Sequence, residues 1–329
     1  MIENNSNPPP QILKKLLYEM LYIRMVEEEI ARVYPEQEMR CPVHLSIGQE
    51  AVAAGICAHL SRVDLMLSNH RSHGHYLAKG GNLRRMLAEL YGRSTGCCNG
   101  KSGSMHLIDL SSGFLGSVPI VGGCIPIATG VAFGAKLKKQ DTVTTVFFGD
   151  GTIEEGVFHE SLNFASLKKL PIVFICENNF FSVYSPLSVR QPQNREIYQI
   201  AKSHGIESFQ GDGNNVLEVY NMMKKCVDII KSGNGPVFLE LKTYRWREHC
   251  GPYYDNHLGY RTEEEFILWK NQCPVESFTR YLISNKILDK NALMEMTQDI
   301  QNTIEESFTF ARESPFPDAD QLMKDVYRE

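Results

Sequence analysis

The chain has 329 residues, of which 43% are hydrophobic and 22% are charged, and its formal net charge at pH 7 is −5. This is the composition of a globular protein that can bury a substantial core, and the acidic balance argues against nucleic acid as a partner. No apolar run is long enough to span a membrane. The nine cysteines are scattered without a CxxC pair, which favours reduced thiols and a cytoplasmic location.

The first part of the chain predicts mainly helices. Residues 1–10 lack the basic start and apolar stretch of a signal peptide, and we expect them to form a disordered lead-in. Apolar residues recur at helical spacing over 11–34. Residues 92–119 hold many Gly and Ser residues and predict an ordered loop system. Further helices are predicted over 48–60, 82–92 and 125–139.

Strands begin to alternate with helices further along. A strand over 142–149, a helix over 156–170 and a strand over 171–177 are predicted in succession. This order is typical of a right-handed parallel βαβ unit. Another buried strand is predicted over 236–246. We therefore predict an α/β fold, a parallel sheet flanked by helices with helical appendages at both ends. It would form one domain over 11–329, with a helical C-terminal part from about residue 262.

Asp150 lies directly after the first strand of this unit, in the sequence FFGDGT. A carboxylate buried at a strand end is costly unless a cation or hydrogen bonds satisfy it. Asn178 and Asn179 follow the next strand, and the carboxyl ends of parallel strands share the edge where ligands bind. We therefore predict that Asp150 and Asn179, with a backbone carbonyl, bind Mg²⁺ or Ca²⁺, and that this cation holds a diphosphate.

The residues around Asp150 suit the same ligand. Gly149 and Gly151 allow a tight turn and close approach of a bulky group. The N–H groups of Gly151 and Thr152, at a helix start, would add to an anion site. A lone GDG is more often a turn, however, and we interpret the second copy, in GDGNN at 211–215, as a turn and helix start because its asparagines follow at once.

The stretch from Gly149 to Asn179 resembles the thiamine diphosphate motif, in which GDG is followed by a helix, a strand and NN. From about residue 12 to 327 the chain is similar to the alpha subunit of the two-chain 2-oxo acid dehydrogenases, the first components of pyruvate, branched-chain and acetoin dehydrogenases. The resemblance implies the thiamine diphosphate-binding fold, thiamine diphosphate and Mg²⁺ as cofactors, and an oxidoreductase that decarboxylates a small 2-oxo acid such as pyruvate. Other matching segments are HLSIGQEA, RSHG, GKSGSMH, IVGGCIPIATG, TYRWREH and YRTEEE.

The resemblance also implies roles for single residues. Arg71 matches an arginine that reaches the diphosphate, and His70 precedes it where relatives usually have tyrosine. Val121 matches an apolar residue against the aminopyrimidine ring. The implied metal ligands are Asp150, Asn179 and the carbonyl of Phe181; the implied cofactor-binding residues are His70, Arg71, Val121, Gly149, Gly151, Thr152, Asn179 and His249; the implied catalytic residues are His73 and His249.

A second chain follows from the same resemblance. Thiamine enzymes need a glutamate beside the aminopyrimidine, which a separate beta subunit provides in this family. We therefore expect an α2β2 assembly, no activity of the lone chain, and a lipoyl acyltransferase as a candidate acyl acceptor. After His249 the chain has Cys250 and Gly251 instead of the family's His-Ser-x-Ser-Asp-Pro, so we expect no phosphorylation control there.

The spacing of residues along the chain suggests two other kinds of site, a zinc site and a phosphate-binding loop. His70, His73 and His75 lie close together in the sequence and suggest zinc, but no cysteine or further histidine has ligand spacing. The sequence GCCNGKS at 96–102 is similar to a phosphate-binding P-loop. However, Thr95 stands where the first glycine is needed, and no strand precedes it.

Other functions stay open. One is an acetoin dehydrogenase alpha subunit, and another is a scaffold subunit without activity. A third is a specialised biosynthetic acyl or ketol transferase of the transketolase-like class. A sugar-phosphate substrate would need basic residues at the site mouth, for which the candidates are Lys101, Arg245 and Arg247.

Overall fold

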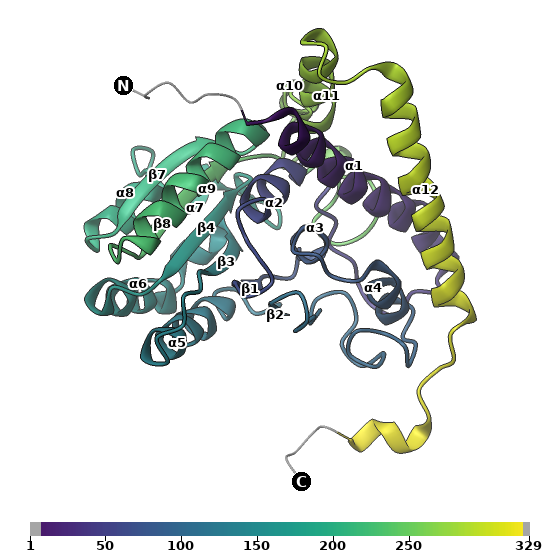
Figure 1. Cartoon of the computed structure of the whole chain (residues 1–329), viewed down its shortest axis with the longest axis horizontal. Helices are drawn as coiled ribbons and strands as arrows, with labels where there is room; N and C mark the ends of the chain where they lie inside the picture. Colours follow the sequence, from purple (N-terminus) through teal and green to yellow (C-terminus); the bar gives the residue numbers. More distant parts are fainter. Residues whose placement is uncertain (1–7, 325–329) are drawn as a thin grey trace.

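A six-stranded parallel sheet forms the centre of the computed structural model, which describes residues 8–324 (Figure 1). The strand order is β2-β1-β3-β4-β8-β7, and every neighbouring pair is parallel. The predicted α/β fold is confirmed. The strands are β1 (Leu65–Ser68), β2 (Phe114–Ser117), β3 (Thr144–Gly149), β4 (Ile172–Asn178), β7 (Glu207–Asp212) and β8 (Val237–Lys242), and a separate antiparallel pair is formed by β5 (Phe181–Ser182) and β6 (Ser185–Pro186).

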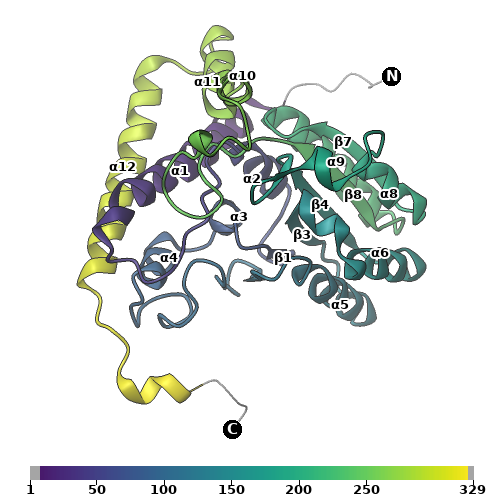
Figure 2. The same cartoon turned by 180° about the vertical axis from the view of Figure 1, so that it is seen from behind.

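Helices cover both faces of the sheet, as the views from the front and from behind show (Figures 1 and 2). On β3 the side chain of Phe147 packs into one core, and those of Val146 and Phe148 pack into the other. This alternation is that of a strand buried on both faces. The first core includes α1 (Pro10–Val33), α2 (Glu50–Cys57), α9 (Val216–Lys231) and α12 (Lys290–Glu313), and the second includes α5 (Cys124–Leu137), α6 (Gly156–Lys168) and α8 (Ile197–Ser203).

The remaining helices are short or lie at the C-terminal end. The described part of the chain contains no helix that is both long and apolar enough to cross a membrane. The lead-in predicted over 1–10 lies outside the described residues at 1–7, and α1 begins at Pro10. The other helices are η1 (Tyr34–Glu36), α3 (His73–Ala78), α4 (Leu83–Leu90), η2 (Asp150–Glu154), α7 (Leu187–Arg190), η3 (Asn256–Leu258), α10 (Glu263–Asn271), α11 (Pro274–Ser284) and η4 (Ala319–Met323).

The predicted βαβ unit is confirmed as β3, α6 and β4, in parallel register from Thr144 opposite Ile172 to Gly149 opposite Glu177. The loop predicted over 92–119 differs, because it contains the strand β2. This strand is four residues long and includes Gly116, so its stability comes from pairing with β1 rather than from its own propensity. The second GDG ends β7, and Asn215 caps α9 as predicted for a helix start.

A buried carboxylate organises the glycine-rich loop that follows α4. Glu89 on α4 is 1% exposed. Because backbone N–H groups of the loop already donate to this carboxylate, they are not arranged as a phosphate-binding loop. The donors to Glu89 are the backbone N–H groups of Cys98, Gly100, Ser102 and Gly103 and the hydroxyl of Ser102.

We predict that Glu89→Gln lowers the free energy of unfolding by about 3 kcal/mol, since the amide –NH₂ would face N–H donors and leave them unpaired. Urea unfolding followed by circular dichroism measures this. The matched control is Glu306→Gln, whose side chain is exposed and pairs with Arg84 at 2.8 Å, and which should change stability by less than about 1 kcal/mol. Equal effects of the two substitutions would contradict the role given to Glu89.

Candidate active site

The segments that follow five of the parallel strands meet at one cavity of about 200 Å³. This edge, at the carboxyl ends of the strands, is where open parallel sheets bind ligands. The cavity is lined by every residue that the sequence assigned to the metal or cofactor. These residues are His70 and Arg71 after β1, Val121 after β2, Gly149, Asp150, Gly151 and Thr152 at the end of β3, Asn179 and Phe181 after β4, and His249 after β8.

Asp150 is fully buried at the floor of this cavity, at the start of η2. Its Oδ2 accepts a hydrogen bond from the guanidinium of Arg190, whereas its Oδ1 has no hydrogen-bond partner. Burial raises the pKa of the Asp150 carboxyl, and Arg190 and the backbone N–H of Asn179 oppose this shift. A buried carboxylate oxygen without a partner is the donor that a bound cation would satisfy, so the site fits a metal ion.

Asn179 lines the same cavity and is held from two sides. Its Nδ2 donates to Oε1 of Gln49 at 3.3 Å, and its Oδ1 accepts from the N–H of Phe181 at 3.2 Å. Asn178 is not among the residues that line the cavity, and its Nδ2 donates to Oε1 of Glu240 at 2.8 Å. The structure therefore brings Asn179, the residue predicted from the motif, to the same cavity as Asp150.

Arg71 supplies a buried positive charge on the cavity wall. Its Nη1 donates to the carbonyl of Leu45 at 2.7 Å and its Nη2 to the carbonyl of His249 at 3.1 Å. Burial, together with the nearby Arg245, lowers the pKa of Arg71 to about 9. The guanidinium is thus cationic at neutral pH and fixed in place, which suits the binding of an anion.

Three histidine rings lie together on another part of the wall. The ring centroids of His44 and His70 are 4.6 Å apart, and that of His249 is 5.1 Å from His44 and 5.3 Å from His70. Burial first, and then the charge of Arg71, lowers the pKa of His70 and His249 to about 3 and that of His44 to about 2. All three rings are therefore neutral near pH 7, with lone pairs that can accept a hydrogen bond or bind a metal ion.

The structure does not bring His73 to the cavity lining. Its ring is fully buried, with Nδ1 at 2.6 Å from Oε1 of Glu27 and Nε2 at 2.7 Å from Oγ of Ser104. His75 has other partners, with Nδ1 at 2.8 Å from Oγ of Ser68 and Nε2 at 3.2 Å from Glu177. The three histidines weighed as a zinc site in the sequence, at 70, 73 and 75, thus face different surroundings, and only His70 lines the cavity.

Several residues of the site were not predicted from the sequence. Arg190 pairs with Asp150, Gln49 holds Asn179, and Glu177 lines the cavity beside His75. His44 lines the cavity as well. Gln49 and His44 belong to the segment HLSIGQEA, whose match to the family was the one signal that could have identified them.

Comparisons with known proteins agree with this geometry. The family model described as "Dehydrogenase E1 component" matches residues 18–320. The chain is 37% identical over 309 residues to the alpha subunit of acetoin:2,6-dichlorophenolindophenol oxidoreductase of Bacillus subtilis, with 94% of this chain and 91% of the relative covered.

Pyruvate dehydrogenase E1 alpha subunits are similar to the same extent. That of Rickettsia felis is 35% identical over 313 residues, which cover 95% of each chain. A chloroplastic alpha subunit of Arabidopsis thaliana is 36% identical over 318 residues, with 94% of this chain and 73% of the relative covered. The resemblance found in the motifs is thereby confirmed, and the chain belongs to the dehydrogenase E1 component family.

Proposed function

We propose that the chain is the alpha subunit of a thiamine diphosphate-dependent 2-oxo acid dehydrogenase. It would act on a small 2-oxo acid, with pyruvate as the first candidate, and pass the acyl group to a lipoyl or other acceptor. The observation that carries this proposal is the unpartnered Oδ1 of buried Asp150, which lines one cavity with Asn179 and Arg71. Membership of the dehydrogenase E1 component family supports it.

Different residues of the cavity would bind different parts of the cofactor. Mg²⁺ would be held by Asp150, Asn179 and the carbonyl of Phe181, a set of hard oxygen donors. The diphosphate would lie against Arg71 and the backbone around Gly151 and Thr152, while the half-exposed Val121 offers an apolar surface to the aminopyrimidine. When bound, thiamine diphosphate supplies the nucleophilic carbon and the electron sink that decarboxylation needs.

The two predicted catalytic histidines have different surroundings. His249 lines the cavity with a neutral ring, so it is suited to orient the substrate or cofactor through a hydrogen bond. His73 is enclosed by Glu27 and Ser104, and we assign it a positioning role, in which it holds the loop of Ser104 against α1. In this role His73 would affect activity through the position of Ser104, without contact with the substrate.

The electrostatic field favours an acid over a neutral substrate. The charges of Arg71 and Arg245 both act on His70 and on His249, and both favour a carboxylate in this part of the cavity. A 2-oxo acid carries such a group, whereas acetoin does not. This charge supports a 2-oxo acid ahead of acetoin among the candidate substrates that we propose.

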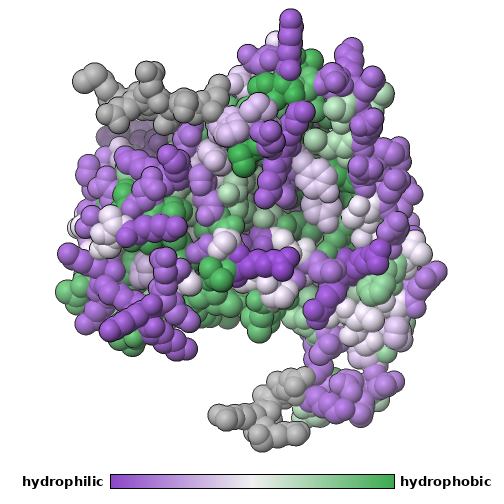
Figure 3. Space-filling model, in the orientation of Figure 1, coloured by the Kyte–Doolittle hydropathy of each residue, from purple (hydrophilic) through white to green (hydrophobic). Residues whose placement is uncertain are grey.

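A beta subunit is proposed to complete the site. At about 200 Å³ the cavity is smaller than the roughly 300 Å³ or more of most ligand pockets, which supports a second wall from another chain. Apolar side chains are also exposed on the lining and on the helix that follows it: Ile120 is 72% exposed, and Ile127 in the first turn of α5 is 50% exposed. Figure 3 shows apolar atoms among polar ones on the lower part of the face that carries α5 and β2 in Figure 1.

We propose an α2β2 assembly on these grounds, with a lipoyl acyltransferase as a candidate further partner. All nine cysteines are free, which supports the proposed cytoplasmic location.

The proposal is tested by assay of the chain with and without a co-expressed beta subunit, using thiamine diphosphate, Mg²⁺ and an artificial electron acceptor. Pyruvate, a branched-chain 2-oxo acid, acetoin and a ketose phosphate are the substrates. We expect decarboxylation of a 2-oxo acid by the two chains together and none by this chain alone. Turnover of the ketose phosphate only would support the transketolase-like alternative, and turnover by the lone chain would contradict the need for a partner.

We predict that Asp150→Ala weakens binding of thiamine diphosphate with Mg²⁺ by on the order of 100-fold or more, because the main anionic ligand of the metal is lost. Isothermal titration calorimetry on the two-chain enzyme measures this, and circular dichroism checks the fold. Asp141→Ala, at an exposed residue before β3, is the matched control and should bind normally. Retained affinity in Asp150→Ala would overturn the metal assignment.

We predict that Arg190→Gln raises the affinity for Mg²⁺ by about tenfold, since about 1.4 kcal/mol corresponds to that factor. The guanidinium of Arg190 donates to Oδ2 of Asp150 and, at 2.6 Å, to Oε1 of Glu154, so its positive charge opposes a metal ion at the neighbouring Oδ1. Mg²⁺ titration at fixed thiamine diphosphate measures the change. Arg195→Gln, at a residue that pairs with Gln191, is the control, and a fall in affinity for Arg190→Gln would show that Arg190 assists binding instead.

A further inference from the structure

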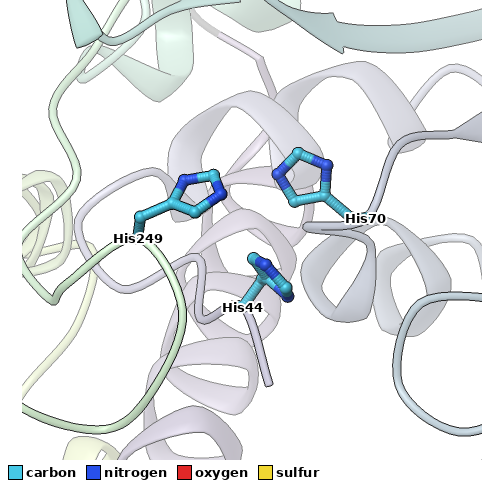
Figure 4. A group of neighbouring side chains, drawn as sticks. All are labelled: His44, His70 and His249. Carbon is cyan, nitrogen blue, oxygen red and sulfur yellow. The ribbon is translucent and has the colours of Figure 1, made fainter. Parts of the chain in front are cut away.

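Three histidines from distant parts of the sequence converge on one wall of the cavity. His44 precedes α2, His70 follows β1 and His249 follows β8. Figure 4 shows the three imidazole rings turned toward one another, and one ring nitrogen from each lies within 4.8 Å of the other two. Such a convergence of three imidazoles has the composition of a transition-metal site.

The ring of His44 has a free ligand atom. His44 is 7% exposed, and its Nδ1 is buried without a hydrogen-bond partner. A buried polar atom without a partner is unusual in a folded protein, because it forfeits its hydrogen bond to water. A metal ion bound through Nδ1 would satisfy it, because each neutral ring offers a lone pair for coordination.

We propose that His44, His70 and His249 bind one divalent transition metal ion of the zinc class, with its fourth coordination position open to the cavity. This site is separate from the oxygen donors of Asp150 and Asn179. Hard carboxylate and amide oxygens select Mg²⁺, whereas neutral imidazoles select Zn²⁺, Co²⁺, Ni²⁺ or Cu²⁺. The two sites therefore discriminate by the chemistry of their ligands.

The geometry requires a small closure of the rings. Zinc–nitrogen bonds of about 2.0–2.1 Å place tetrahedral ligand atoms about 3.4 Å apart. Ring nitrogens that now lie within 4.8 Å of one another must therefore approach by up to about 1.4 Å, which is within the range of side-chain rotation. His249 would use Nε2, because Nη2 of Arg71 lies 3.5 Å from its Nδ1.

Positive charge limits the affinity. Arg71 and Arg245 lie near enough to the rings to act on His70 and His249, and they repel a cation. No carboxylate belongs to the cluster, although Glu177 lines the same cavity. We therefore expect a dissociation constant in the micromolar range rather than the much tighter binding of structural zinc sites.

Two other places in the described chain could bind the same metals and must be separated from this site. The ring nitrogens of His159 and His204 are 3.3 Å apart near the surface. Glu89, Cys97 and Cys98 form a second group with ligand atoms in range, although the carboxylate of Glu89 already accepts hydrogen bonds from its loop.

The experiment is a Co²⁺ titration of the full chain in excess Mg²⁺, followed by visible absorption and calorimetry. We expect one ion per chain at this site, with the d–d bands of nitrogen-ligated Co²⁺, and displacement by Zn²⁺. His44→Gln and His70→Phe should each weaken binding at least tenfold, and His70→Phe keeps the aromatic volume so that its fold is retained. His204→Gln and Cys98→Ser are the controls and should leave the bands unchanged.

The results that overturn the proposal are equally specific. Absence of nitrogen-type bands in the unmodified chain would do so, as would their persistence in His44→Gln and His70→Phe together. Loss of the bands in His204→Gln would place the ion at the surface pair, and a thiolate charge-transfer band that Cys98→Ser removes would place it at the cysteines. His70 and His249 line the same cavity as the proposed cofactor site, so binding of thiamine diphosphate with Mg²⁺ is measured separately and failure of one proposal is distinguished from failure of the other.

Discussion

The site depends on one constraint, a carboxylate that is buried at the end of a parallel strand with one oxygen unpartnered. β3 places Asp150 at the edge where four other strands also deliver their following loops. This carboxylate is fully buried, and Arg190 satisfies only one of its oxygens. Leaving the second oxygen unpaired makes the free protein less stable, and binding of a cation there removes this cost. Part of the free energy of metal binding therefore comes from the unpaired oxygen in the folded protein.

The charges around Asp150 act in opposite directions at the two ends of the cavity. Near Asp150, the guanidinium of Arg190 compensates the buried negative charge of the carboxylate. At the other end Arg71 pairs with no carboxylate of residues 8–324, and it donates to the carbonyls of Leu45 and His249. An anionic ligand therefore gains from Arg71, and a metal ion at the unpaired Oδ1 of Asp150 needs negative charge nearby to offset the charge of Arg190. A metal–diphosphate pair meets both conditions at once, which neither a free metal nor a free phosphate does.

The sequence predicts what depends on local pattern and fails where partners are distant. β3, α6 and β4 follow from apolar runs and helical spacing, and parallel pairing then puts Asp150 and Asn179 at one edge. β2 was missed because its stability comes from β1 and not from its own residues. The contacts of Asp150 with Arg190 and of Asn179 with Gln49 join segments that share no local pattern, so spacing could not reveal them.

The histidines show that closeness in the sequence does not predict closeness in the folded chain. Close spacing along the chain grouped His70, His73 and His75, yet α3 begins at His73 and directs the latter two rings into separate buried hydrogen-bonded pairs. The rings that meet His70 come from segments before α2 and after β8, and only the closing of the sheet edge brings them together. As a result, oxygen donors and nitrogen donors occupy different walls of one cavity. Histidines that are close in the sequence thus share a helix, as His73 and His75 do. The strand order determines which rings lie together at the cavity.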